Sequence, residues 1–249
     1  MCVSLGMANK KNLVVLSGSG ISAESGIATF RGGNGLWDNV PVEEICTPDG
    51  WRRNPAKVLK FYNNLRAQMQ DRQPNAAHTI LAELESEYNV CVITQNVDNL
   101  HERAGSSRIL HLHGELTKVR PEDCYNDYDG FSTKYVQDIG YRAVELGETG
   151  GPHNKQLRPH IVWFGEAVPN LEKAAQLVSV AEILVIVGTS LQVYPAASLY
   201  HYAPSGCQIW LIDPDERLGH QLEAAGIHVI TDVATRGVRL FREQISQLL

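Results

Sequence analysis

The sequence predicts an α/β fold, a doubly wound parallel Rossmann-like sheet with a smaller helical and loop subdomain inserted into it. Strand-length apolar runs alternate with helix-length segments through the last third of the chain. The run 90–94 is apolar at nearly every position, which is typical of parallel strands covered by helices on both faces. The first run, 13–16, leads through a glycine turn into a helix start, as a phosphate-binding unit does.

The composition is that of a folded globular chain. With 249 residues, 43% hydrophobic and 20% charged, it can form one large domain or one large and one small. The net charge of −6 does not favour nucleic acid as a partner. The five cysteines include no C-x-x-C pair, so neither a disulfide framework nor a zinc pattern is present. Without a membrane-length apolar run or a secretory pattern in residues 1–11, we expect a cytoplasmic location and no membrane partner.

The first strand ends in a turn in which Gly18 and Gly20 flank Ser19, and a helix can begin at Ser22. Glycines let the backbone come close to an anion, and exposed N–H groups with the helix dipole supply positive potential. The spacing G-x-G-x-x-A predicts a dinucleotide pyrophosphate site. On this pattern alone, a plain tight turn is the alternative.

A loop rich in Gly, Asn and Thr follows at 26–37, yet it contains Phe30, Arg31 and Trp37. A solvated loop rarely needs these three side chains together. We expect a lid over a bound ligand, with Arg31 near a phosphate. The alternative is that Phe30 and Trp37 only anchor the loop to the core.

Two helices are predicted next, at 55–70 and 76–88, with a break at Pro74-Asn75. They lie between the first strand and the next clear one, at 90–94. A simple βαβ unit does not need so much chain, so we infer an inserted helical subdomain.

Polar residues follow the strand 90–94: Gln95, Asn96 and Asp98. In open α/β sheets, ligands bind beyond the carboxyl ends of the strands, so these side chains can reach whatever the glycine turn holds. Capping of the next helix by Asn96 or Asp98 is the alternative.

A short strand at 108–114 has alternating histidines, and period-two alternation places His111 and His113 on one face. His113 precedes a glycine at the strand's end, the position of a general base in this class of sheet. A structural histidine is the alternative.

The segment 120–157 is polar and turn-rich at both ends, with one helix predicted at 131–146. We interpret it as a small surface module. A strand at 157–166 follows it.

The last part is regular. Helices are predicted at 171–180, 196–202, 218–225 and 234–248, and strands at 183–187, 208–212 and 227–230. The small polar turn 188–190 suits contacts to a ribose or phosphate. Helix capping by Ser190 is the alternative.

Six motifs occur in a fixed order: GSGISAESGI at 18–27, TFR at 29–31, TQNVDNLH at 94–101, LHG at 112–114, IVWFGE at 161–166 and GTSL at 188–191. Together they resemble the sirtuins, the NAD-dependent protein lysine deacylases, over nearly the whole chain. The chain is most similar to the bacterial type related to the desuccinylase-like class.

The resemblance implies one sirtuin-like catalytic domain over 1–249. Its NAD-binding part would be 1–32, 76–119 and 158–249, and its small subdomain 33–75 and 120–157. The implied NAD contacts are Gly18, Ser19, Gly20, Glu24, Phe30, Arg31, Trp37, Gln95, Asn96, Asp98, His113, Gly188, Thr189, Ser190, Asp213 and Ala234. The implied acyl-lysine contacts are Tyr62, Arg66, Val162, Phe164, Gly165 and Glu166, with the 162–166 segment pairing with the substrate backbone.

The implied reaction removes an acyl group from a protein lysine. The acyl oxygen attacks the ribose carbon as nicotinamide leaves, in a site that the Phe30 loop keeps dry. Asn96 and Asp98 orient the carboxamide and ribose, and His113 is the general base on a ribose hydroxyl. The products would be nicotinamide, free lysine and an O-acyl-ADP-ribose. An acylated-lysine protein is the implied partner, and the chain is expected to be a monomer or weak oligomer.

Three departures from the family pattern matter. The family's structural zinc uses two cysteine pairs after the LHG motif, but this region has only Cys124, so we expect no zinc and a 131–146 helix in its place. The desuccinylase-like Tyr-x-x-Arg is represented by Tyr62 with Leu65 at the arginine position and Arg66 one residue late. The acyl group therefore stays open between acetyl and an acidic one such as succinyl, and Arg66 could instead be a solvated surface residue.

The third departure is Ser19 for alanine and Asp213 for asparagine. Ser19 is small enough for the turn, and a carboxylate near the adenine ribose favours NAD over NADP. Three other functions are compatible with part of the sequence pattern. A dehydrogenase would need an acidic residue after the second strand, and Asp38 lies in the loop instead. ADP-ribosyl transfer or NAD hydrolysis would use the same fold. A non-catalytic NAD sensor would not need Asn96, Asp98 and His113 together.

Overall fold

The computed structural model describes residues 10–29, 41–124 and 133–247. Within these ranges the larger sheet has six strands, all parallel, in the order β10-β9-β8-β1-β2-β3. The strands are β1 (Asn12–Ser17), β2 (Asn89–Thr94), β3 (Ile109–His111), β8 (Ile183–Val187), β9 (Gln208–Ile212) and β10 (His228–Ile230). Because the chain runs outward from β1 on one side and returns to β8 on the other, the strand order reverses between β1 and β8, where such sheets bind ligands.

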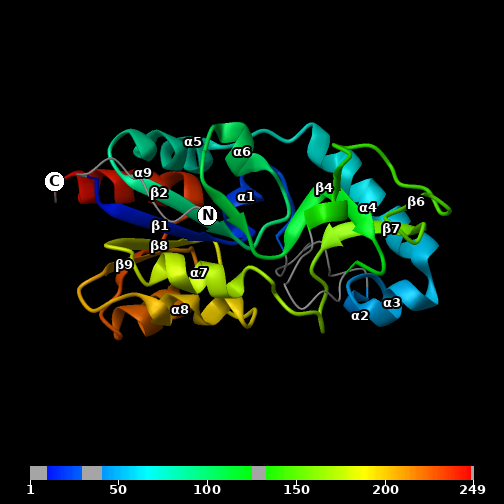
Figure 1. Cartoon of the computed structure of the whole chain (residues 1–249). Helices are drawn as coiled ribbons and strands as arrows, with labels where there is room; N and C mark the ends of the chain where they lie inside the picture. The colour runs from blue at the N-terminus through cyan, green and yellow to red at the C-terminus, as the bar shows by residue number, and fades with distance from the viewer. Residues whose placement is uncertain (1–9, 30–40, 125–132, 248–249) are drawn as a thin grey trace.

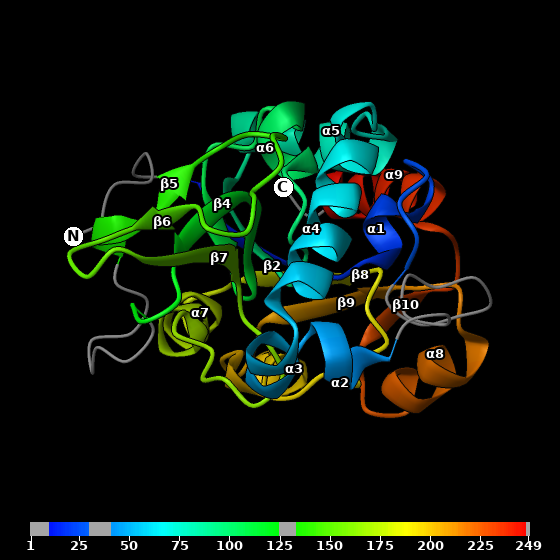
Figure 2. The same ribbon diagram turned by 90° about the vertical axis from the view of Figure 1, so that its right-hand side faces the viewer.

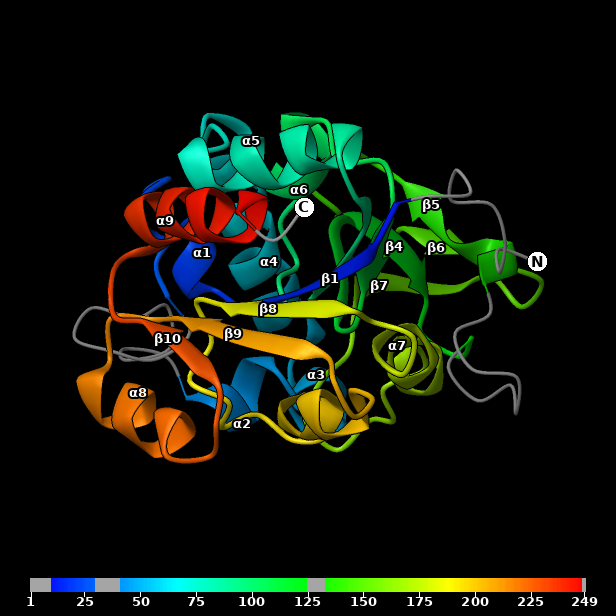
Figure 3. The same cartoon turned by 90° about the vertical axis from the view of Figure 1, so that its left-hand side faces the viewer.

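Helices cover both faces of this sheet, as Figures 1 and 3 show. Leu13 and Val15 of β1 point to one face and Val14 and Leu16 to the other, and all four are buried. The first face packs on α5 (Ala76–Glu83) and α9 (Ala234–Ser246), with α6 (Leu100–Ala104) beside α5. The second packs on α7 (Leu171–Val178), the 3-10 helix η3 (Ala196–Tyr202) and α8 (Glu216–Glu223). The predicted doubly wound sheet is confirmed.

A second sheet lies at the other end of the molecule (Figure 1). In the described part of the chain it has four antiparallel strands in the order β5-β4-β7-β6. These are β4 (Gly114–Pro121), β5 (Gln137–Asp138), β6 (Thr149–Gly150) and β7 (Lys155–Ile161). The helices α2 (Val42–Ile45), α3 (Pro48–Arg53) and α4 (Pro55–Gln70) lie beside it, as Figure 2 shows.

The second sheet and these helices share one apolar core. Trp51 of α3, Tyr62 of α4, Leu116 of β4 and the buried Trp163 after β7 belong to it. The inserted smaller subdomain is thus present, and it contains an antiparallel sheet as well as helices. The predicted subdomain boundaries at 119 and 158 fall inside the strands β4 and β7.

The predicted helix at 131–146 is wrong in its described part. A 3-10 turn, η2 (Thr133–Tyr135), leads directly into β5, which pairs with Lys118 and Val119 of β4. Gly140 then takes a left-handed φ of +57°, which ends any helix there. The buried Val144 is held through its backbone by the Asn63 side chain. Sheet pairing and these tertiary contacts override the weak helical pattern.

Smaller differences concern element ends. The helix predicted at 76–88 is α5 followed by the 3-10 turn η1 (Leu84–Ser86), and the strand predicted at 157–166 stops at Ile161. The strand predicted at 108–114 divides: β3 stops at His111 and β4 begins at Gly114. A Cβ on Gly114 would lie 1.9 Å from the His160 carbonyl oxygen, so only glycine allows this crossing. No helix within the described ranges is long and apolar enough to cross a membrane.

Candidate active site

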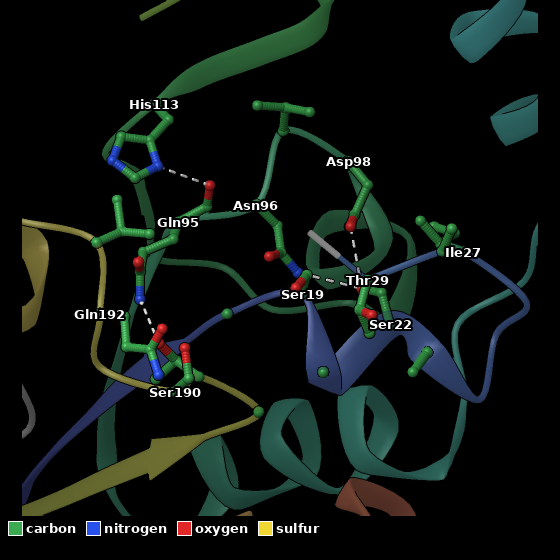
Figure 4. Close-up of a pocket in the computed structure, with 18 of the residues that line it drawn as sticks. Ser19, Ser22, Ile27, Thr29, Gln95, Asn96, Asp98, His113, Ser190 and Gln192 are labelled. Atoms are coloured by element: carbon green, nitrogen blue, oxygen red, sulfur yellow. Dashed lines mark hydrogen bonds between the residues drawn. The ribbon is translucent and has the colours of Figure 1, made fainter. Parts of the chain in front are cut away.

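A cavity of about 530 Å³ lies at the carboxyl ends of the parallel strands and extends to the second sheet's core. Part of it is shown in Figure 4. It gathers nearly all the described residues that the sequence singled out: Gly18, Ser19, Gly20, Glu24, Tyr62, Gln95, Asn96, Asp98, His113, Val162, Phe164, Gly165, Glu166, Gly188, Thr189, Ser190, Asp213 and Ala234. Phe30, Arg31 and Trp37 lie outside the described residues.

The glycine turn packs directly on the turn after β8. Gly18 N–H donates to the Val187 carbonyl at 3.0 Å, and Gly20 N–H donates to the Gly188 carbonyl at 2.8 Å. A Cβ on Gly20 would lie 2.7 Å from the Gly188 Cα. The two turns therefore need glycine to form one continuous wall at the point where the strand order reverses. The short helix α1 (Gly20–Ala23) starts there.

A buried polar cluster joins α1 to the loop after β2, with its members drawn in Figure 4. The Ser22 hydroxyl donates to Oδ2 of Asp98 at 3.0 Å, and Asn96 Nδ2 donates to the Ser22 hydroxyl at 3.2 Å. The Leu100 N–H donates to the other Asp98 oxygen at 3.1 Å. Burial raises the pKa of Asp98, and these donors oppose that rise. An amide and a carboxyl side by side can bind a group that both donates and accepts, such as a carboxamide.

His113 lies in the bend between β3 and β4 and faces the cavity. Its Nδ1 is 3.0 Å from the Gln95 carbonyl oxygen. Because a carbonyl only accepts, Nδ1 must carry the proton, which leaves the Nε2 lone pair free to take one. Burial lowers the pKa of His113, so the ring is neutral near pH 7. This is the state that a general base needs.

Another part of the cavity is lined by the turns after β8 and β9. Gln95 Nε2 donates to the Thr189 hydroxyl at 3.1 Å, which links the loop after β2 to the 188–190 turn. Burial raises the pKa of Asp213, whose carboxyl accepts from the Asp215 N–H at 3.0 Å. Glu24 accepts two hydrogen bonds from Thr235, at 2.9 and 2.7 Å. It therefore joins α1 to the start of α9, a role that the sequence did not indicate.

The other end of the cavity is mainly apolar and belongs to the second core. The Tyr62 hydroxyl accepts a hydrogen bond from Trp163 Nε1 at 3.0 Å and donates to Cys46 Sγ at 3.6 Å. Leu65 and Met69 of α4 also line the cavity. They follow Tyr62 by three and seven residues, a helical spacing that could have identified them. Cys46 lies in a segment without a recognisable pattern.

The segment after β7 is held by a buried ion pair. Arg158 donates to both oxygens of Glu166, at 2.7 and 3.2 Å, and its guanidinium lies 3.3 Å from the centre of the Trp163 ring. Glu166 also accepts from the Trp163 N–H at 2.8 Å. These contacts fix the turn that presents Val162, Phe164 and Gly165 to the cavity.

Arg66 does not line the cavity, although the sequence made it a candidate for the acyl group. Its side chain is fully buried, and it donates to the Leu116 carbonyl at 2.7 Å and to Asn63 Oδ1 at 2.8 Å. The one-residue offset on α4 turns Arg66 toward β4 and leaves Leu65 at the cavity. The alternative of a solvated surface residue is also wrong.

Together, the reversal of strand order, the glycine wall and the polar cluster define a dinucleotide-binding α/β protein with an apolar extension to its cavity. The chain belongs to the Sir2 family, whose sequence model matches residues 18–195. It is 53% identical over 241 residues to an NAD-dependent protein deacylase of Bacteroides thetaiotaomicron, covering 96% of this chain and 98% of that protein. The family predicted from the six motifs is confirmed.

Solved structures agree with this assignment. A Sir2 homologue in complex with NAD is 38% identical, with a TM-score of 0.78 over 95% of this chain and 91% of that one. A Sir2 homologue variant in complex with 2′-O-acetyl-ADP-ribose has the same identity and TM-score, over 96% of this chain and 95% of that one.

Proposed function

We infer that this chain is an NAD-dependent protein deacylase that moves an acyl group from a protein lysine to ADP-ribose. The observation that carries this inference is His113, a neutral histidine whose Nδ1 is bound to the Gln95 carbonyl and whose other nitrogen is free to accept a proton. It lines one cavity together with the Asn96–Asp98 cluster and the apolar residues around Tyr62. A dinucleotide and an acylated side chain can therefore meet beside a base.

Each part of the cavity then has a role in the proposed reaction. The glycine turn takes the NAD pyrophosphate, and the 188–190 turn with Asp213 and Ala234 takes the adenosine half. Asn96 and Asp98 bind the carboxamide and orient the ribose. The acyl oxygen displaces nicotinamide at the ribose carbon, and His113 then accepts a proton from a ribose hydroxyl as that oxygen attacks the acyl carbon. A water molecule then adds to the acyl carbon as the bond from that carbon to the lysine nitrogen breaks, which releases free lysine and O-acyl-ADP-ribose.

The protein substrate is proposed to lie along residues 162–166, at the mouth of the cavity. Phe164 is 41% exposed there, although its N–H donates to the Cys46 carbonyl at 3.0 Å. The N–H groups of Val162 and Trp163 also donate within the chain. Pairing with a substrate strand would therefore rely on Gly165 and on the carbonyl groups of the segment.

For the acyl group, we propose a preference for neutral chains over acidic ones. The end of the cavity is lined by Cys46, Tyr62, Leu65 and Met69, and the lining residues that the structure describes include no Lys or Arg. The similarity to the desuccinylase-like class rests here on Tyr62 alone. An acid buried in such surroundings without a cation would be strongly disfavoured.

We also propose that the second sheet folds without the family's structural zinc. Its region contains one cysteine, Cys124, so the four-thiolate donor set does not fit. Contacts between side chains tie this part together instead. His153 binds Asp123 at 2.8 Å, and Trp51 donates to Glu122 at 2.9 Å. One zinc per purified chain by metal analysis would contradict this proposal.

The test of the function is an acyl panel. Purified protein is incubated with NAD and peptides that differ only in the lysine: acetylated, butyrylated, succinylated and unmodified. Release of nicotinamide only with acylated peptides, together with O-acyl-ADP-ribose, is the expected result. Release without any peptide would instead indicate NAD hydrolysis, and ADP-ribose attached to the unmodified peptide would indicate ADP-ribosyl transfer.

A further inference from the structure

A second histidine, His111, contacts the backbone of the loop that carries Asn96. Its ring is buried; Nδ1 lies 3.0 Å from the Asn96 carbonyl oxygen and Nε2 lies 2.7 Å from Oε1 of Glu102 on α6. His113 holds the neighbouring Gln95 carbonyl through its own Nδ1. Two histidines, two residues apart, thus fix two successive carbonyls of the site loop.

The partners of His111 determine its charge. A carbonyl and a carboxylate only accept hydrogen bonds, so both ring nitrogens must donate and the ring must be an imidazolium. Burial opposes this charge, but the bond to Glu102 outweighs it and raises the pKa of His111. The Glu102 side chain is 39% exposed, so it is only partly buried; this partial burial opposes its charge, yet the bond to His111 lowers its pKa. The proton therefore lies on the ring, in an ion pair.

None of the other titratable groups described around His111 takes the place of Glu102 as its charged partner. Burial keeps His101 neutral, with its pKa well below the usual value, and burial with nearby cations lowers the pKa of His160 to about 3. Glu115 is paired with Lys118 at 2.7 Å. In the described part of the chain, the titratable and charged groups near the His111 ring are Glu102 and His101 of α6, Glu115 and Lys118 of β4, Asp98 of the loop after β2 and His160 of β7.

We propose that His111, charged through its pairing with Glu102, is a positioning residue that holds the Asn96 carbonyl and thereby fixes the NAD-binding loop. This rests on the proposed function, since the loop matters only if NAD binds there. A neutral imidazole has one N–H, so loss of the proton leaves either the Asn96 carbonyl or the Glu102 carboxylate facing a lone pair. The loop is then held less firmly, and NAD binds more weakly at alkaline pH.

The same corner has the spacing of a cation site, because the ligand atoms of Glu102, His111 and Glu115 all lie within 4.8 Å of one another. Two contacts argue against a cation. The imidazolium already satisfies Glu102, and Lys118 already satisfies Glu115. A metal would have to displace both positive groups, so a metal effect is treated as an outcome of the test.

The experiment is titration of NAD into the wild type, Glu102→Gln and His111→Ala by calorimetry, from pH 6 to 9.5. Glutamine can donate to Nε2 of a neutral ring whose Nδ1–H still reaches Asn96, so Glu102→Gln keeps both bonds without the charge. The wild type should lose about tenfold in NAD affinity at alkaline pH, and Glu102→Gln should vary less than about twofold. His111→Ala should bind about tenfold more weakly at pH 7.

The control is Glu172→Gln, an exposed surface change on α7 that should titrate like the wild type. An alkaline loss in Glu102→Gln equal to that of the wild type would overturn the proposal, as would wild-type affinity in His111→Ala. If His111→Ala does not fold, the Glu102→Gln profile still decides. A changed NAD affinity after EDTA or added Zn²⁺ would indicate a cation site instead. This experiment measures NAD binding, whereas the acyl panel measures the reaction. A failure of the His111 proposal can therefore be distinguished from a failure of the proposed function.

Discussion

The Ser22 hydroxyl donates a hydrogen bond to the carboxyl of Asp98 at 3.0 Å, and both residues are buried. Ser22 belongs to α1 and Asp98 to the loop after β2, so this contact joins two walls of the cavity. Burial raises the pKa of Asp98, and the Leu100 N–H and the Ser22 hydroxyl, which both donate to its carboxyl group, oppose that rise. The Ser22 hydroxyl therefore helps to keep the Asp98 carboxyl ionised.

Ser22→Ala should raise the pKa of Asp98 further and remove the acceptor of Asn96. We expect NAD affinity to fall by about tenfold, the size of one hydrogen bond to a charged group. The acid limb of kcat/KM for NAD should move to higher pH, because Asp98 protonates earlier. Steady-state kinetics over pH measure both effects. Ser179→Ala, which removes an exposed hydroxyl that donates to the Gln176 carbonyl, is the control. An unmoved acid limb would argue against the role of Ser22.

His113→Ala should lower turnover by about 10²–10⁴-fold while NAD binding is retained, because only the proton transfer is lost. In the wild type, the rate should fall as pH drops through the pKa of His113, which burial places below the usual 6.5. Single-turnover assays and NAD titration separate the two quantities. The general-base role fails if the variant keeps wild-type turnover, or if its loss is explained by lost NAD binding.

Acid should destabilise the fold through buried neutral histidines. Burial lowers the pKa of His78 to about 4 and, with nearby cations, that of His160 to about 3. Their unfolded forms bind protons near pH 6.5 and the folded forms do not, so stability is full above pH 6.5 and declines as pH falls toward the folded values. Each such histidine costs about 1.4 kcal/mol per pH unit in that window.

Urea unfolding at pH 7, 6 and 5 measures this decline. His160→Gln should unfold with about one fewer proton taken up between pH 6 and 5, so its curve should be flatter than that of the wild type. The exposed His220→Gln is the matched control and should follow the wild type. A wild-type slope in His160→Gln would show that this histidine is not neutral in the folded chain.

Arg66→Leu should destabilise the fold without changing acyl preference. It removes the donors to Leu116 and Asn63 and leaves a buried carbonyl unpaired, at a cost of about 2–4 kcal/mol. Burial also lowers the pKa of Arg66 to about 10, so its charge is already disfavoured there. Lys60→Leu, on the exposed face of the same helix, should change stability by less than about 0.5 kcal/mol. A shifted ratio of succinyl to acetyl turnover in Arg66→Leu would contradict this structural role.

The site was predictable where the sequence places function at the ends of strands. The residues 18–20, 95–98 and 188–190 directly follow the strands β1, β2 and β8, and a parallel sheet brings the carboxyl ends of its strands to one edge. His113 was found by the same reasoning, although β3 stops two residues before it. Local pattern suffices here because the strand itself fixes where its last residue points.

Prediction failed where tertiary contacts decide. Residues 133–146 have no strong pattern of their own, and pairing with β4 made a short strand where a helix was expected. The sequence placed Arg66 on a helix that does reach the cavity, but it did not fix the rotation of that helix, α4, about its axis. That rotation turns Leu65, and not Arg66, toward the cavity. The bond between Glu24 and Thr235 joins residues 211 positions apart, so no local pattern could indicate it.

The exchange Leu65→Arg should convert the neutral end of the cavity into one that accepts an acidic acyl group. Leu65 lines the cavity one helical turn from Tyr62, and the described lining around it has no cation of its own. An arginine here could form a paired hydrogen bond with a succinyl carboxylate, worth about 1.5–3 kcal/mol, while its charge would oppose a neutral chain.

The ratio of succinyl to acetyl kcat/KM should therefore rise at least about tenfold in Leu65→Arg. Competition assays with both peptides and limiting NAD measure this ratio directly. Leu65→Met keeps an apolar side chain of similar volume and should leave the ratio within about twofold. If Leu65→Arg folds, binds NAD and still prefers acetyl to the wild-type extent, then the acyl group does not reach residue 65, and the proposed acyl end of the cavity must lie elsewhere.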